Sequence, residues 1–253
     1  MIVWYAVRSG LADYTAIYTW RTWLAGWYLR VLAQVMFFAL IGTLLRSPER
    51  TWFLLVGNAI LLAALEGIWA LNLVNREREA GTLPLLAASP TSPVLVFAAR
   101  GAYLVADGVL AALGALFVAG PVFGLPLPWP RSLLLVPLTV LVGASAYCAG
   151  VFLAGLLVRL RVVEAMVANL GVLALMALCG VNVPPPTSAA YALPLTNGLV
   201  AVRQVLAGDL GSAGRHAVAE ALVGLCWLGL GVLTFQRLVQ RGRRDGTLDF
   251  ADQ

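Results

Sequence analysis

The sequence predicts an all-α membrane protein with six transmembrane helices, and three observations lead to that prediction. Hydrophobic residues make up 61% of the 253-residue chain and charged residues only 11%, whereas soluble domains contain roughly 25% charged residues. The mean hydropathy is +0.88. Several apolar runs exceed the roughly 20 residues that cross a hydrocarbon core of about 30 Å. These long runs exclude an outer-membrane β-barrel, whose strands alternate apolar and polar residues.

The first 23 residues are expected to form an amphipathic helix at the membrane interface. Six aromatic residues in this stretch are interspersed with Arg8, Asp13 and Arg21. Trp and Tyr favour the headgroup layer, where an apolar ring and a polar tip are both accommodated. The stretch lacks the basic start, apolar run and small-residue cleavage site of a signal peptide.

Residues 24–239 are expected to hold the six spans, within a single membrane domain that covers residues 1–253. Prolines, glycines and arginines separate the apolar runs and mark the ends of the spans. A longer linker, residues 184–215, precedes the last span, and residues 240–253 form a polar tail. The expected spans cover residues 24–45, 52–75, 94–122, 132–158, 162–183 and 216–238.

The distribution of arginine favours an orientation with both termini in the cytoplasm, because cytoplasmic segments of membrane proteins are enriched in basic residues. Ten arginines then lie on the cytoplasmic side and five on the opposite side. The five are Arg46, Arg50, Arg131, Arg203 and Arg215; the ten are Arg8, Arg21, Arg76, Arg78, Arg159, Arg161, Arg237, Arg241, Arg243 and Arg244.

Missing residue types exclude several kinds of chemistry. All 17 basic residues are arginine, so the chain has neither the lysine of a Walker A loop nor a lysine for Schiff-base chemistry. His216 is the single histidine, and the three cysteines, Cys148, Cys179 and Cys226, lie far apart in apolar runs. We therefore expect no metal site, no disulfide framework and no cofactor bound by this chain. The net charge of +5 is attributed to basic loops facing anionic lipid rather than to nucleic-acid binding.

A polar segment between the second and third spans, residues 76–90, is the strongest candidate for a functional site. Four alternating charges, Arg76, Glu77, Arg78 and Glu79, end the second span. Gly81 permits a backbone reversal, and Thr82 can cap a short helix. That helix would present an apolar surface inside a charged collar, as a docking surface for a soluble partner does. An ordinary interfacial loop is an equally good interpretation on physical grounds alone.

The same segment resembles the loop between the second and third spans of ABC-2-type transporter permeases. The family pattern reads Glu-x-Glu-x-Gly-Thr-Leu-Glu-x-Leu-Leu-x-x-Pro. Pro84 departs from it, standing where the family usually has an acidic residue. The positions that match are Glu77, Glu79, Gly81, Thr82, Leu83, Leu86 and Pro90.

A second segment, residues 193–208, is similar to the family pattern before its last span, where a proline precedes a short amphipathic helix with arginine and a terminal glycine. From the residues themselves, Leu195, Leu199, Val202 and Leu206 share one helical face, and Asn197 and Arg203 lie off it. Gly208 stands where a helix C-cap is expected. The resemblance implies short re-entrant or interfacial helices between spans five and six.

The resemblance covers most of the chain and implies how the protein works. Such a permease forms half of a translocation pathway with a second permease, identical or paralogous, and pairs with two ATP-binding subunits that carry ATP and Mg²⁺. The loop at residues 76–90 becomes the coupling helix that docks into the ATP-binding subunit. Export across the bacterial inner membrane is the implied activity. The cargo stays open among lipid-linked glycans, hydrophobic drugs or antibiotics, and peptides.

Five charged residues fall inside the expected spans, where they should face protein or water because charge is costly in hydrocarbon. We expect Arg30 or Arg100 to pair with Glu66. Asp107 lies deep in the third span and is a candidate for the pathway or a subunit interface. The five residues are Arg30, Glu66, Arg100, Asp107 and Glu164.

Carboxylates inside a membrane also suit a proton-coupled secondary transporter, which is the main alternative function. That interpretation lacks an inverted repeat with matching broken helices. A membrane-embedded enzyme is a third possibility, but neither a H-E-x-x-H motif nor a nucleophile elbow occurs.

Overall fold

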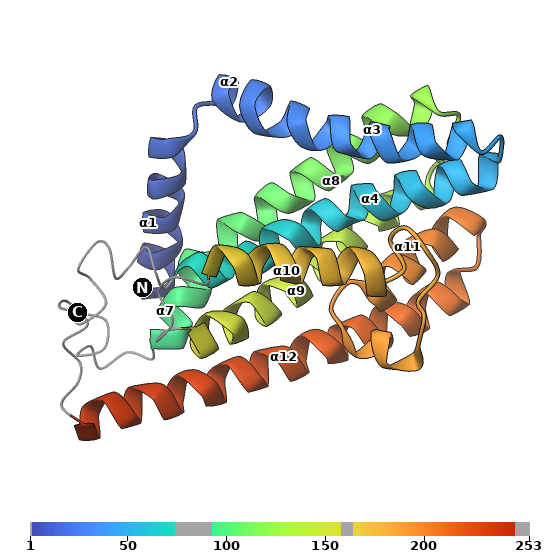
Figure 1. The fold of residues 1–253 in the computed structure, drawn as a ribbon. Helices are drawn as coiled ribbons and strands as arrows, with labels where there is room; N and C mark the ends of the chain where they lie inside the picture. The colour runs from blue at the N-terminus through green and yellow to red at the C-terminus, as the bar shows by residue number, and fades with distance from the viewer. Residues whose placement is uncertain (1, 74–92, 158–163, 246–253) are drawn as a thin grey trace.

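The computed structural model describes residues 2–73, 93–157 and 164–245, and every regular element in these ranges is a helix. The long helices run side by side in one bundle, whereas α1 (Ile2–Ile17) stands across one end of it (Figure 1). The beginning of α1 and the end of the last helix, α12 (Leu210–Asp245), lie at that same end of the bundle (Figure 1). The orientation of the two termini across the membrane stays a prediction.

Within the described residues, five helical stretches are long and apolar enough to cross a bilayer: Trp20–Leu44, Pro48–Asn72, Ala98–Val122, Arg131–Leu156 and Leu210–Thr234. They correspond to the expected spans one, two, three, four and six. The expected fifth span is described only as α10 (Glu164–Leu178), a 15-residue helix, which is shorter than a complete crossing requires. The all-helical membrane fold is therefore confirmed with five spanning helices, and the sixth crossing stays a prediction.

The boundary between the N-terminal helix and the first span lies earlier in the chain than expected, because the N-terminal helix ends before residue 23. It ends at Ile17, and Trp20 already belongs to the helix of the first span. The new helix begins with a reciprocal cap, in which the Thr19 side chain accepts from the Thr22 N–H and the Thr22 side chain accepts from the Thr19 N–H. From there α2 (Trp20–Thr22), the π-helical segment η1 (Trp23–Tyr28) and α3 (Leu29–Leu44) continue without a break.

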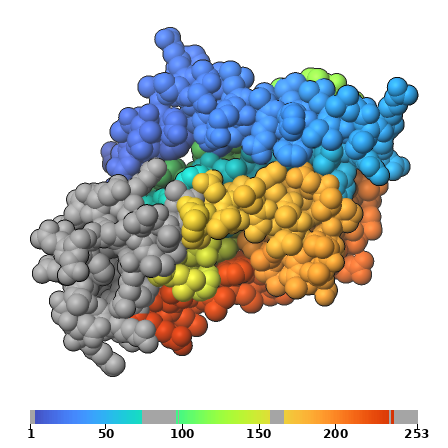
Figure 2. Space-filling model, viewed as in Figure 1, coloured from blue at the N-terminus to red at the C-terminus, as the bar shows by residue number. Residues whose placement is uncertain are grey.

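The central helix of the bundle is α4 (Pro48–Ile68), which packs against α3, α8 (Ala102–Val122), α9 (Leu135–Leu157) and α10. Ser47 caps its first turn, and Pro48 stands at the first helical position, where its missing N–H costs nothing. Fifteen of its 21 residues are buried. The second half of α4 is visible only as a narrow strip between α3 and α10 (Figure 2). A 3-10 turn, η2 (Trp69–Asn72), continues it.

Glycine permits the close contact between α4 and α9. A Cβ atom added at Gly67 would lie 2.6 Å from the backbone nitrogen of Tyr147, and one added at Gly150 would meet the carbonyl oxygen of Gly67. Small residues at such contacts let two backbones approach, which is how helices associate inside a membrane without a hydrophobic driving force.

The expected third span consists of two helices. The short helix α7 (Pro93–Arg100) is followed by a turn at Gly101 and then by α8. A Cβ atom at Gly101 would collide with the hydroxyl of Tyr147, so the turn lies directly against α9. The break makes α7 a separate element at the end of the bundle where the chain begins.

Short helices fill the chain between α10 and α12, as the sequence predicts. They are η4 (Ser188–Ala192) and α11 (Thr196–Ala207); a further short turn, η3 (Arg131–Leu134), precedes α9. Gly208, with φ +92°, ends α11 in the left-handed conformation expected of a C-cap. Three members of the predicted apolar face, Leu195, Leu199 and Val202, are fully buried, whereas the fourth, Leu206, is only partly buried.

The α4–α9 contact yields a stability prediction. Gly67→Ala should lower the thermal midpoint of the purified protein by several degrees, because overpacking costs about 1–3 kcal/mol. Gly229→Ala is the matched control, since a Cβ atom there has no neighbour within 4 Å, and it should leave the midpoint unchanged or raise it slightly. A fluorescence-detected melt in detergent measures both. Equal midpoints for the two variants would contradict the close contact.

Candidate functional site

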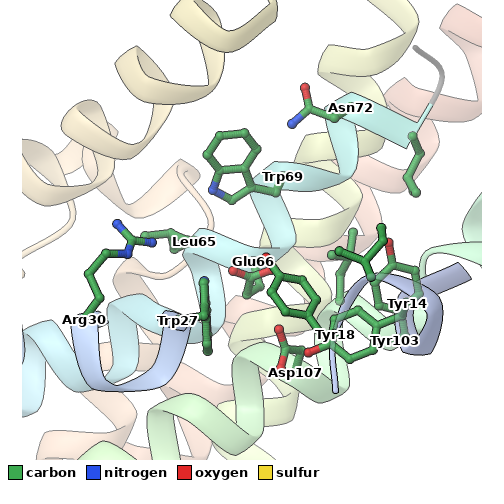
Figure 3. A pocket seen from close by; sticks show the side chains of 13 residues that line it. Tyr14, Tyr18, Trp27, Arg30, Leu65, Glu66, Trp69, Asn72, Tyr103 and Asp107 are labelled. Carbon is green, nitrogen blue, oxygen red and sulfur yellow. The ribbon is translucent and has the colours of Figure 1, made fainter. Parts of the chain in front are cut away.

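Three of the five expected intramembrane charges line one cavity. Arg30 comes from α3, Glu66 from α4 and Asp107 from α8, and they face a cavity of about 280 Å³. Figure 3 shows the side chains of Glu66 and Asp107 among aromatic rings, with Trp27 between Glu66 and Arg30. The remaining residues that line the cavity are Tyr14, Ile17, Tyr18, Trp27, Leu65, Trp69, Asn72, Leu73, Tyr103 and Leu104.

Asp107 is the best-defined polar group of this cavity. It is 8% exposed, and its Oδ1 atom accepts a hydrogen bond of 2.6 Å from the indole Nε1 of Trp23. The Tyr14 hydroxyl is buried next to Asp107. Burial and the nearby Asp107 carboxyl group raise the pKa of Tyr14, so this hydroxyl stays protonated at neutral pH. The buried Asp107 carboxyl group thus lies beside the indole N–H of Trp23 and the hydroxyl of Tyr14, both from the N-terminal part of the chain.

Aromatic rings from several helices pack around the same carboxyl group. The ring centroids of Tyr14 and Tyr103 are 5.0 Å apart, and those of Tyr14 and Tyr18 are 5.4 Å apart. On the other side, Trp23 stacks on Tyr28 with 5.2 Å between ring centroids. These separations are typical of favourable aromatic pairs. The rings fix α1 and η1 against α8 and determine the shape of the cavity.

A second, larger hollow of about 530 Å³ lies on the other side of Asp107. It is bounded by α1, by the start of the first span and by α8. Four residues, Tyr14, Tyr18, Tyr103 and Asp107, line both spaces. The other residues that line the larger hollow are Val7, Leu11, Thr15, Thr19, Trp20, Trp23, Ala102, Ala106 and Leu110.

Arg100 forms its ion pair with a residue other than the expected one. Its Nη2 atom lies 2.6 Å from Oδ2 of Asp13, so the pair joins α7 to α1. The Asp13 side chain is 53% exposed, and such a pair contributes at most about 1 kcal/mol to stability. Gly10 allows the same two helices to approach, because a Cβ atom there would collide with the Arg100 carbonyl group. The expected pairing of Glu66 with Arg30 or Arg100 stays a prediction.

The proposed coupling residues, at positions 76–90, lie outside the described residues, as does the side chain of Glu164. The structure does describe both flanks of the loop. Leu73 ends the continuation of α4, and Pro93 begins α7.

Sequence reasoning missed Glu220, which is completely buried in α12. Its Oε1 atom accepts a hydrogen bond of 2.8 Å from the Leu195 N–H, and its Oε2 atom accepts one of 2.9 Å from the Gly198 N–H. The carboxyl group therefore caps the N-terminus of α11, where helix N–H groups lack internal partners. The signal was present in the sequence, since Glu220 is a lone acid within the last apolar run, as Asp107 is within the third.

The polar residues of α11 are also buried more deeply than expected. Asn197 is 4% exposed and donates to the Tyr191 carbonyl oxygen. Arg203 donates to the carbonyl oxygens of Gly180 at 2.8 Å and Phe53 at 3.0 Å, and its guanidinium group lies 3.5 Å from the Phe53 ring centroid. Burial lowers the pKa of Arg203 to about 9. Both side chains lie off the predicted apolar face and are still enclosed, because α11 packs against α4, α9 and α12.

Comparison with known families matches residues 10–207 to the ABC-2 type transporter. The match covers the second half of α1, the first four spanning helices, α10 and α11, together with the loop at residues 76–90. No curated protein and no solved structure matches the chain. Permeases of this family are transport subunits that work with ATP-binding subunits. The match and the spanning helices together show that the chain belongs to the ABC-2 type transporter family, as the multi-pass membrane permease of an ABC transporter.

Proposed function

We propose that this permease forms half of the translocation pathway of an ATP-driven exporter, and that residues 76–90 couple it to a separate ATP-binding subunit. The observation that carries the proposal is the family match, which extends across this loop. The alternating charges Arg76, Glu77, Arg78 and Glu79 and the apolar residues Leu83 and Leu86 suit a docking surface with an apolar centre and a charged rim.

The positions of the two described segments that flank residues 76–90 support a coupling role. These flanks, Leu73 and Pro93, lie at the end of the bundle where α1 begins and α12 ends (Figure 1). The last residue of α9 and the first residue of α10 lie toward that same end (Figure 1). A soluble subunit docked there would contact the permease on one side of the membrane only.

The helix α7, which follows the loop directly, has contacts through which a movement of the loop would reach the bundle. The Arg100–Asp13 ion pair joins it to α1. The Tyr147 hydroxyl of α9 donates to the carbonyl oxygen of Ala98 at 3.1 Å. Helix α7 also packs against α8 and α12. A displacement at residues 76–90 would thus be passed to α1, α8, α9 and α12, because α7 contacts all four helices.

The remaining parts of the assembly follow from the family. We propose two permeases, identical or paralogous, with two ATP-binding subunits that hold ATP and Mg²⁺, while this chain binds no cofactor. The protein would reside in a bacterial inner membrane with both termini in the cytoplasm, in agreement with the arginine distribution. The pathway would run between the two permeases.

One prediction of this proposal concerns ATP hydrolysis by the permease alone. The purified permease should hydrolyse no ATP by itself, because the chain has no lysine for a Walker A loop. Adding its ATP-binding subunit should produce hydrolysis, measured as phosphate release in lipid vesicles. An ATP-binding subunit with its Walker A lysine replaced is the control. Appreciable hydrolysis by the permease alone would contradict the two-component assembly.

Another prediction of this proposal concerns coupling between residues 76–90 and the ATP-binding subunit. Replacing Glu77 and Glu79 together with alanine should weaken binding of the ATP-binding subunit by about tenfold, since interfacial charge pairs are worth roughly 1.4 kcal/mol or more. Transport per ATP hydrolysed should also fall. Glu49→Ala is the matched control, because Glu49 is an exposed acid in the first turn of α4, at the other end of the bundle. Unchanged binding and transport in the double variant would exclude the loop as the coupling element.

The third prediction concerns orientation. In a variant with Cys148, Cys179 and Cys226 replaced by alanine, Ala80→Cys should react with a membrane-impermeant maleimide only from the cytoplasmic side. Glu49→Cys should react only from outside, because it lies at the opposite end of the bundle. Labelling in intact cells and in inverted vesicles measures both. Labelling of position 80 in intact cells would reverse the proposed topology.

A further inference from the structure

The larger hollow beside Asp107 has the size of a small-molecule site. Its volume of about 530 Å³ falls within the range of about 300–1,000 Å³ that is typical of ligand pockets. Five aromatic side chains contribute to its walls: Tyr14, Tyr18, Trp20, Trp23 and Tyr103. Such walls offer flat apolar surfaces and the negative faces of aromatic rings.

A single charge lies in these walls. Asp107 is the only charged residue among the described residues that line the hollow. One of its oxygen atoms, Oδ1, accepts from Trp23, and neutral hydrogen bonds of this kind leave the net charge of a carboxylate in place. The nearby Arg100 forms an ion pair with Asp13 and does not line the hollow. A carboxylate shielded from water acts strongly on a nearby cation, because the local dielectric constant is low.

The rim of the hollow is apolar and exposed. Leu11 is 51% exposed, Trp20 71% and Leu110 64%, and all three line the hollow. Trp20 begins the first spanning helix and Leu110 belongs to the third. A ligand would therefore enter across a surface that suits lipid, at the junction of the N-terminal helix and the bundle.

We propose that this hollow binds a lipophilic organic cation, with Asp107 as its counter-charge and the tyrosine and tryptophan rings around its apolar body. A cation over aromatic faces is stabilised by their quadrupoles in addition to the ion pair. The identification of the cation as a transported cargo rests on the proposed transport function. The binding site itself is a property of this chain.

Lipid is the competing occupant, and its chemistry fits less well. An acyl chain would fill the apolar part of the hollow but would leave the Asp107 carboxylate without a counter-charge. An anionic lipid would bring a second negative charge close to Asp107, which is unfavourable in a medium of low dielectric constant. Charge complementarity thus distinguishes a lipophilic cation from an acyl chain and from an anionic lipid.

The test compares tetraphenylphosphonium with tetraphenylborate, two ions of nearly equal size and apolar surface but opposite charge. The complex of permease and ATP-binding subunit is placed in lipid nanodiscs without nucleotide, and equilibrium binding of each radiolabelled ion is measured against empty discs. We expect saturable binding of the phosphonium ion alone. Asp107→Asn should weaken it by at least about tenfold, because the amide preserves the acceptor for Trp23 but removes the charge.

Two further variants separate charge from folding. Ala106→Phe should weaken phosphonium binding without changing any charge, because Ala106 is an exposed residue of α8 that lines the hollow. Glu49→Gln is the matched control, since Glu49 is an exposed acid in the first turn of α4 that lines neither space, and it should keep the affinity. Thermal melts verify that each variant is folded.

Several results would overturn the proposal. Equal binding of the two ions, unchanged phosphonium affinity in Asp107→Asn, or equal losses in Asp107→Asn and Glu49→Gln would each exclude a cation site at Asp107. Failure of the proposed function is distinguishable, because phosphonium binding is measured without nucleotide. A complex that hydrolyses ATP and transports but does not bind the phosphonium ion would disprove only this inference.

Discussion

A helix that begins inside an apolar environment needs acceptors for its first N–H groups, and in this protein Glu220 supplies them. Its two carboxyl oxygens accept from Leu195 and Gly198 at the start of α11. Each N–H group left without a partner there would cost about 1–3 kcal/mol. Leu195 also has φ +89°, a conformation that costs a non-glycine residue about 1–3 kcal/mol. The contact with Glu220 thus holds the chain in an unfavourable turn, which lets α11 pack between α4, α9 and α12.

The other polar groups at that end of the bundle follow the same constraint. Arg203 donates hydrogen bonds to the carbonyl oxygens of Gly180 and Phe53, which take the place of water. Asn58 is fully buried in α4 and donates to the Asn182 side chain at 2.9 Å. Because every one of these bonds joins two elements, satisfying the polar groups also fixes the helices relative to one another. At the opposite end, α7 and α1 are joined by a half-exposed ion pair instead. The bundle is therefore held by buried contacts at one end and by a weaker, more accessible contact at the other.

Much of the fold could be predicted from the sequence because the spans are set by length and hydropathy. The apolar face of α11 and its end at Gly208 were predicted from helical periodicity and cap chemistry. The division of the third span at Gly101 was not, because its cause is the distant Tyr147 side chain. The Arg100–Asp13 pair was missed for a related reason, since the crossing of α1 over the bundle brings together residues 87 positions apart. The sequence predicts how deep a residue lies along its own helix. It does not identify the residue of another helix that this residue contacts.

Asp107 forms part of the wall between two spaces, and this has a consequence for occupancy. One carboxylate can neutralise one monovalent cation, whichever side that cation occupies. Two such ligands, one in each space, would repel each other across a thin wall of tyrosine rings in a medium of low dielectric constant. Occupation of the side nearer the lipid would therefore weaken binding of a cation on the inner side. The two spaces share the Asp107 carboxyl group, although the inner one also has Glu66 and Arg30 in its walls.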